Sequence, residues 1–316
     1  LAIIQSYFIA SYLASPTQNL VDNSINLRLF YILAVTSLVT GTMFLLWLGE
    51  QITEKGIGNG ISLIIFSGIV SRFPHALSQL SNSNFNVIKL MMIALVILAV
   101  TLVVVTFERA QRRILVKYPK RQVGNKVYGG QSQHMPLKIN MAGVIPPIFA
   151  QSILMFFGLM PTLLGVMNKP GFLQSFFTHL QFGKPVWMIV FAILVIFFGF
   201  FYTAIMFNPK EMSDNLRNQG GYIEGIRPGK KTADYLDKVV SHLTCFGTIY
   251  LAAVSLLPAF LIDLFHVPFY FGGTSLLIVV VVLIDFLSQV QSHIFSAQYH
   301  RLMNKSKGSR KGFVRR

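Results

Sequence analysis

VWMIVFAILVIFFGFFYTAIM, residues 186–206, is a run without a single charged side chain. About 20 such residues, coiled into a helix, span the roughly 30 Å hydrocarbon core of a bilayer. A buried helix of a water-soluble protein is usually shorter and carries polar residues on one face. We therefore expect this segment to cross a membrane, and the lipid bilayer to be the solvent in which the chain folds.

The composition extends this prediction to the whole chain. Of its 316 residues, 53% are hydrophobic and only 12% are charged, whereas about a quarter of the residues of a soluble domain are charged. An ionised side chain at the bilayer centre costs about 2.5 to 3.5 kcal/mol, so charge-free stretches mark the spans. The sequence predicts an all-α polytopic transmembrane helical bundle with spans near 1–14, 28–48, 57–73, 89–107, 141–163, 185–207, 240–262 and 273–292.

The formal net charge of +16 is distributed unevenly between the two sides of the predicted bundle. One side holds the basic loop 108–140, the loop 208–239 and the basic tail 293–316, which together carry most of the lysines and arginines. Connectors rich in Lys and Arg remain in the cytoplasm. We therefore expect a multi-pass protein with a cytoplasmic C-terminus. The other side keeps only Arg28, Arg72, Lys89, Lys169 and Lys184.

Several function classes are disfavoured. The single cysteine, Cys245, excludes an internal disulfide, and the seven histidines lack zinc-ligand spacing. The central thirds of the predicted spans hold no carboxylate pair and no Ser/His/Asp set, so we expect no enzymatic activity and no cofactor or metal. The chain opens in apolar sequence, LAIIQSYFIASYLA, without a basic leader, and we expect it to lack its natural N-terminus.

The two long connectors differ in charge. Loop 108–140 carries eight basic residues and one acid, Glu108, which suits topological retention, anionic lipid or a polyanion such as ribosomal RNA. Loop 208–239 carries both basic and acidic residues, and we interpret it as a structured projection. Asn208-Pro209 is expected to end one helix, Asp214 to begin or support a short one, and Pro228-Gly229 to form a turn. Arg227 lies at that turn, where a solvated charge is the simpler interpretation.

Within the spans, polar groups are sparse. Asp285 is the exception, and it raises the alternative of a proton relay in a secondary transporter. GIGNG, residues 56–60, lacks the spacing of a phosphate-binding loop and is interpreted as a helix entry. Apolar residues such as Ile61 and Ile65 face lipid or a core in the simplest interpretation, although a hydrophobic ring also closes a pore by dewetting.

Five segments carry a resemblance to a known family: GIGNGISLIIFSGIV (56–70), ERAQRRILVKYPKR (108–121), YGGQSQHMPLKINMAGVIPPIFAQSI (128–153), FNPKEMSDNLRNQGGYIEGIRPGKKT (207–232) and VPFYFGGTSLLIVVVVLIDFLSQVQ (267–291). In this order they resemble the SecY family, the central subunits of the bacterial protein-conducting translocon. The resemblance implies ten transmembrane helices in two inverted halves, of which helices three to ten are expected here. Residues 1–107 would hold helices three to six, 141–207 the gate helix and its partner, and 240–292 the last two helices.

The resemblance also implies a function and a set of partners. The implied function is passage of unfolded secretory polypeptides across the bacterial inner membrane, with lateral release of apolar segments into lipid. The implied partners are SecE, SecG, the SecA motor, the ribosome with its RNA and proteins, and the translocating polypeptide with its signal sequence. A secondary transporter of a small solute and a non-conducting docking scaffold for ribosomes remain as alternatives.

Particular residues acquire expected roles through the resemblance. The pore ring would comprise Ile61, Ile65, Ile148 and Ile278. The lateral gate would involve Gln5, Val144, Gln151, Ser152 and Phe156. Ribosome or motor docking would involve Arg109, Arg112, Arg113, Lys117, Lys120, Arg121, Lys126 and Arg227. The pair Asn125-Lys126 departs from the two basic residues of many relatives, so one cationic contact is missing at that tip.

Overall fold

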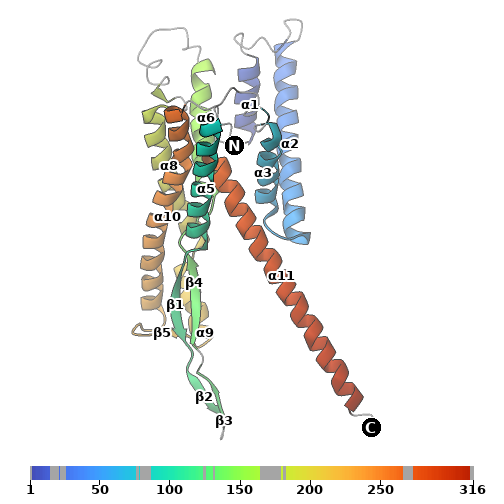
Figure 1. Ribbon diagram of the computed structural model, residues 1–316, viewed down its shortest axis with the longest axis vertical. Helices are drawn as coiled ribbons and strands as arrows, with labels where there is room; N and C mark the ends of the chain where they lie inside the picture. Colours follow the sequence, from blue (N-terminus) through green and yellow to red (C-terminus); the bar gives the residue numbers. More distant parts are fainter. Residues whose placement is uncertain are drawn as a thin grey trace. The chain divides into compact units, whose positions relative to one another are not determined.

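The computed structural model describes residues 2–14, 21, 26–75, 78, 87–123, 126–130, 132–163, 179–180, 183–265 and 273–313. Each predicted span overlaps a helix within these residues, which confirms that the apolar segments are helical (Figure 1). The helices that overlap the predicted spans are α1 (Ala2–Leu13), α2 (Leu27–Lys55), α3 (Gly60–Val70), α5 (Val87–Arg109), α6 (Ile145–Leu163), α8 (Pro185–Met206), α10 (Lys230–Phe265) and α11 (Gly273–Phe313). By length and composition, α2, α8, α10 and α11 contain segments able to cross a membrane.

Two helices extend well beyond the predicted spans. Helix α10 begins at Lys230 rather than near residue 240, and α11 continues to Phe313 rather than ending near 292. Apolar runs predict only the membrane-embedded length of a helix. A helix continues past that length wherever no breaker interrupts it, because its backbone hydrogen bonds are satisfied internally.

The basic loop 108–140 contains strands, which the sequence pattern does not predict. Strand β1 (Gln111–Lys117) pairs antiparallel with β4 (Ser132–Lys138), and β2 (Lys120–Val123) pairs with β3 (Lys126–Gly129). A two-residue strand, β5 (Tyr222–Ile223), adds to the other side of β1. On β1, Ile114 and Val116 are buried at alternate positions, as expected of a strand with one covered face. Pro136 is tolerated because β4 lies at the edge of the sheet.

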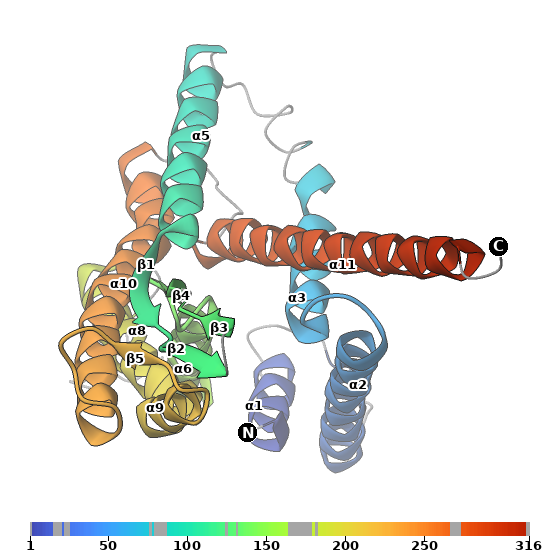
Figure 2. The same ribbon diagram turned by 90° about the horizontal axis from the view of Figure 1, so that it is seen from below.

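The chain forms two compact units, Leu1–Asn84 with Ile278–Arg316, and Phe85–Leu277. In the second unit, α8 packs against both α6 and α10, and Figure 2 shows α8 and α10 side by side. Gly199 on α8 permits this approach, since a side chain there would collide with the Thr248 methyl on α10. The buried rings of Trp187 and Phe191 stack at 5.1 Å on the same helix.

In the first unit, α2 turns sharply into α3 through the glycine-rich segment. A side chain on Gly60 would strike the carbonyl oxygen of Gly49, so the two backbones meet directly. The Thr53 hydroxyl accepts from Gly60 N at 2.8 Å, and Asn59 caps α3 by accepting from Ile61 N at 3.1 Å. The helix-entry interpretation of residues 56–60 is thereby confirmed, and the turn fixes the direction of α3.

Candidate functional site

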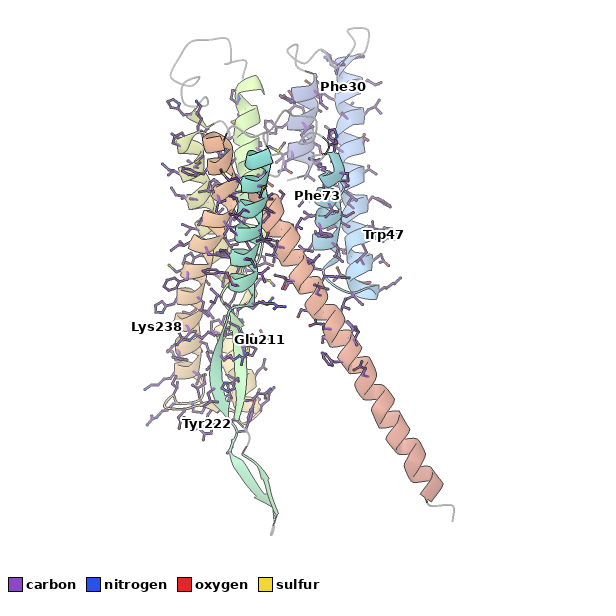
Figure 3. All side chains as sticks on the ribbon, in the orientation of Figure 1. Phe30, Trp47, Phe73, Glu211, Tyr222 and Lys238 are labelled. Atoms are coloured by element: carbon purple, nitrogen blue, oxygen red, sulfur yellow. The ribbon has the colours of Figure 1, made fainter. Side chains whose placement is uncertain are left out.

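The two charged connectors form one folded unit rather than two separate loops. We call this unit the polar subdomain. It comprises β1, β4 and the continuous stretch from α9 (Pro209–Asn218) through β5 to the first turns of α10. Figure 3 labels Glu211, Tyr222 and Lys238 on it. Burial of an aliphatic side chain contributes about 1.5 to 3 kcal/mol, so a shared core holds the connectors together. The core comprises Ile114, Val116, Leu137, Leu216, Ile223, Leu236, Val239 and Val240.

Helix α9 begins at residues that favour a helix N-terminus. Asn208 accepts a hydrogen bond from Glu211 N at 3.3 Å, and Pro209 occupies the first turn, where a missing N–H costs nothing. The predicted short helix is confirmed, although it begins at Pro209 and Asp214 lies inside it. Leu216 on its inner face joins the shared core, so α9 is held against the sheet.

The turn that carries Arg227 has a fixed backbone and an exposed side chain. The Thr232 hydroxyl donates to the Arg227 carbonyl at 2.9 Å, and the Ser213 hydroxyl donates to the Gly229 carbonyl at 2.8 Å. Gly229 has a φ of 102°, a conformation that favours glycine. The predicted turn is confirmed, and its rigidity presents the Arg227 guanidinium to solvent without a large ordering cost on binding.

The remaining docking candidates divide by environment. Arg109, Arg112 and Arg113 are exposed near the start of the hairpin. Lys117 is instead engaged within the chain: its Nζ lies 2.7 Å from Glu224 Oε1, and this hydrogen bond raises the pKa of Lys117. The side chains of Lys120, Arg121 and Lys126 and the whole of Asn125 lie outside the described part of the chain, as do those of the basic residues in the tail from Arg301 onward.

The predicted ring residues lie on three helices. Ile61 and Ile65 are one turn apart on α3, with Ile61 exposed and Ile65 half-buried. Ile148 is half-buried on α6 directly after the buried pair Pro146-Pro147, and Ile278 is 5% exposed on α11. Ile148 belongs to the unit Phe85–Leu277 and the others to the first unit, so their closure into a ring stays a prediction.

The gate candidates centre on α6. Val144 is buried just before this helix, Phe156 is half-buried, and the Ser152 hydroxyl donates back to the Ile148 carbonyl at 2.8 Å. Gln151 Oε1 accepts a hydrogen bond from the Thr274 hydroxyl on α11 at 2.7 Å. Sequence reasoning missed this link, because the two residues are far apart in the chain. Gln5 is exposed on α1.

Comparison with known proteins identifies the family. Residues 1–287 match the family model described as SecY. The chain belongs to the SecY family. Among its relatives, the protein translocase subunit SecY of Escherichia coli K12 is 50% identical over 312 residues, which is 97% of this chain and 70% of that protein. The SecY subunit of Pseudomonas aeruginosa is 51% identical over 292 residues, or 90% of this chain and 66% of that protein.

Solved structures agree on the SecY fold. One is described as a protein-conducting channel, and it superposes with a TM-score of 0.64 at 20% identity, covering 92% of this chain and 71% of its own. A second, a SecY protein whose plug domain stabilises the closed state of its translocation channel, gives the same TM-score at 21% identity and the same coverage. At this identity the likeness establishes the fold of the chain.

Proposed function

We propose that this chain is the pore-forming subunit of a protein-conducting channel that passes unfolded polypeptides across a membrane. The observation that carries the proposal is 50% identity along 97% of the chain to a protein that is itself a translocase subunit. Several apolar helices and a folded polar subdomain are consistent with it. The comparisons offer no support for the alternative of a small-solute transporter.

The proposed barrier is the isoleucine ring of Ile61, Ile65, Ile148 and Ile278. Small hydrated ions lose their water on entering a narrow apolar constriction, so such a ring blocks them without a charged gate. An extended polypeptide displaces the side chains as it enters. Because isoleucine offers no charge and no side-chain hydrogen bond, no substrate sequence is held tightly enough to stall.

The proposed lateral exit runs along α6. A translocating segment of about 20 apolar residues is more stable in lipid than in a watery pore, so an opening beside Gln151, Ser152 and Phe156 would let it leave sideways. The Gln151–Thr274 hydrogen bond is one of the contacts that hold α6 in place. Gln5 and Val144 complete the proposed gate.

The polar subdomain is proposed to dock the machinery that supplies the polypeptide. Exposed Arg109, Arg112, Arg113 and the rigidly presented Arg227 suit the phosphates of ribosomal RNA or acidic residues of the SecA motor. Energy would come from nucleotide hydrolysis in that motor or from chain elongation on the ribosome. We further propose SecE and SecG as fellow subunits, the bacterial inner membrane as the location, and a cytoplasmic polar subdomain and C-terminus.

Site-specific crosslinking of a stalled secretory polypeptide tests the proposed function. Photoreactive residues introduced at Ile65, Ile148 or Ile278 should react with the stalled chain, whereas one at Ile189, which is exposed on α8, should react with lipid. A lack of substrate adducts at all three positions would contradict the proposal. Ribosome binding without pore adducts would favour a docking scaffold, and loss of solute uptake in Asp285→Asn with export intact would favour a transporter.

A further inference from the structure

A buried carboxylate and a buried amide meet at the end of α5. Glu108 is 7% exposed and Asn140 is 5% exposed, and Asn140 Nδ2 donates to Glu108 Oε1 at 2.7 Å. The same Nδ2 donates to the carbonyl of Gly143 at 3.2 Å. An amide nitrogen has two hydrogens, so one side chain holds two neighbours at once.

These contacts lie at the root of the β1–β4 hairpin. Ile139 N donates to the Ala110 carbonyl at 3.2 Å, and Ala110 N donates to the Phe107 carbonyl at 3.1 Å. The strand ladder therefore continues directly into the end of α5. Glu108 and Asn140 flank this junction, one on each arm, and their hydrogen bond closes it.

The same junction leads into α6. Gly143 has a φ of 62°, which turns the chain after Asn140, and α6 begins at Ile145. The bond from Asn140 to the Gly143 carbonyl fixes this turn. Ile148 lies in the first turn of α6, so the direction of that turn also sets the position of this side chain.

Helix α10 forms the wall of the junction. A side chain on Gly247 would lie 2.8 Å from the Ile139 carbonyl oxygen, so α10 packs directly on the backbone here. The Phe107 ring stacks on the Tyr250 ring at 4.4 Å. This packing shields the Glu108–Asn140 hydrogen bond from water, and a shielded bond to a charged group is worth more than an exposed one.

We propose that Glu108 and Asn140 are positioning residues that fasten the first turn of α6 to the root of the hairpin. The polar subdomain and the N-terminal end of α6 then move together, and a partner bound to the hairpin pulls on α6. The consequence for conduction rests on the proposed function. The attachment itself does not, and it is measured without any substrate.

Hydrogen exchange read by mass spectrometry tests the attachment in the purified full chain. Asn140→Asp has the same shape but loses both donated hydrogen bonds and places two carboxylates together. We expect amide exchange at Phe149 and Ala150 to accelerate roughly tenfold or more, the effect of losing a charge-assisted hydrogen bond. Exchange in α8 should not change. A general loosening of both helices, or no change at α6, would overturn the proposal.

A swapped pair separates positioning from simple packing. In Glu108→Gln with Asn140→Asp, the glutamine amide donates to the aspartate, so the link between residues 108 and 140 is restored. The bond to the Gly143 carbonyl stays lost, because a carboxylate only accepts, and recovery is therefore expected to be partial. We expect α6 exchange to return towards the wild-type rate. A double variant no better than Asn140→Asp would remove Glu108 from the proposal.

A milder variant with its own control tests the proposal if Asn140→Asp does not fold. Glu108→Gln alone keeps an acceptor oxygen but removes the charge, and should accelerate exchange at Phe149 in the same direction by a smaller factor. Glu224→Gln is the matched control, because it makes the same substitution at an exposed site of the polar subdomain. Equal exchange in Glu108→Gln and wild type would contradict the proposal.

Discussion

Lys117 on β1 and Glu224 just after β5 form an ion pair of 2.7 Å that joins the two connectors of the chain. Beside it, Val116 pairs with Ile223 and Lys117 with Tyr222 in the sheet register. The Lys117 side chain is 37% exposed and the Glu224 side chain 67%, so the pair lies at the surface and orients β5 more than it stabilises the fold. The apolar core beneath it supplies most of the stability.

The Lys117 amine is predicted to react slowly with acylating reagents while Glu224 is present. Their hydrogen bond raises the pKa of Lys117, so the amine keeps its proton to higher pH than an isolated lysine. The contribution of the pair is complete below the ordinary lysine pKa and disappears as pH rises through the raised value. In Glu224→Gln, acylation of Lys117 near pH 9 should become faster, as measured by mass spectrometry. Exposed Lys238 serves as control, and an unchanged Lys117 rate would contradict the prediction.

The helix entry at Gly60 is predicted to tolerate no side chain. In Gly60→Ala the added carbon meets the Gly49 carbonyl oxygen, so α2 and α3 must separate. Overpacking of this kind typically costs about 1 to 3 kcal/mol, which should lower the unfolding temperature in detergent. Gly68→Ala, on the same helix with nothing within 4 Å, is the control and should be neutral or stabilising by up to about 1 kcal/mol. Similar unfolding temperatures for the two variants would refute the packing argument.

The proposed isoleucine ring is predicted to prevent ion leakage through the resting protein. Ile65→Thr or Ile278→Thr places a hydroxyl in the constriction, which lowers the cost of wetting and should increase ion flux through the resting protein. Flux is measured as dye-reported leakage from vesicles that contain the protein. Ile189→Thr on the exposed face of α8 is the matched control and should not leak. Tight vesicles with all three variants would argue against a hydrophobic ring.

Arg227 is predicted to contribute to the salt dependence of ribosome binding. If its guanidinium contacts one phosphate of ribosomal RNA, Arg227→Ala should weaken ribosome binding and reduce the slope of log affinity against log salt by about 1. Co-sedimentation over a range of salt concentrations measures both quantities. Arg217→Ala removes another exposed arginine, from the end of α9, and should leave the slope unchanged. Equal slopes in wild type and Arg227→Ala would exclude that contact.

The amino-acid sequence predicts the structure correctly where composition decides the outcome. Residues 186–206 form α8 almost to the predicted residue, because an uncharged run of that length has no stable place outside a bilayer. The sequence pattern does not predict the strands of the basic loop, such as β1 and β4. In that loop the cations dominate the composition, while the strand signal lies in a few alternating residues such as Ile114 and Val116.

The sequence by itself determined that the chain is helical and membrane-embedded, which segments are apolar helices, and which family it resembles. These properties follow from local hydropathy and from motifs that are continuous along the chain. Only the tertiary structure decided that the two connectors share a core, that Lys117 is paired with Glu224, and that Asn140 ties Glu108 to the turn before α6. Such contacts join residues distant in the chain, and their energies depend on distance and burial, which a linear pattern does not contain.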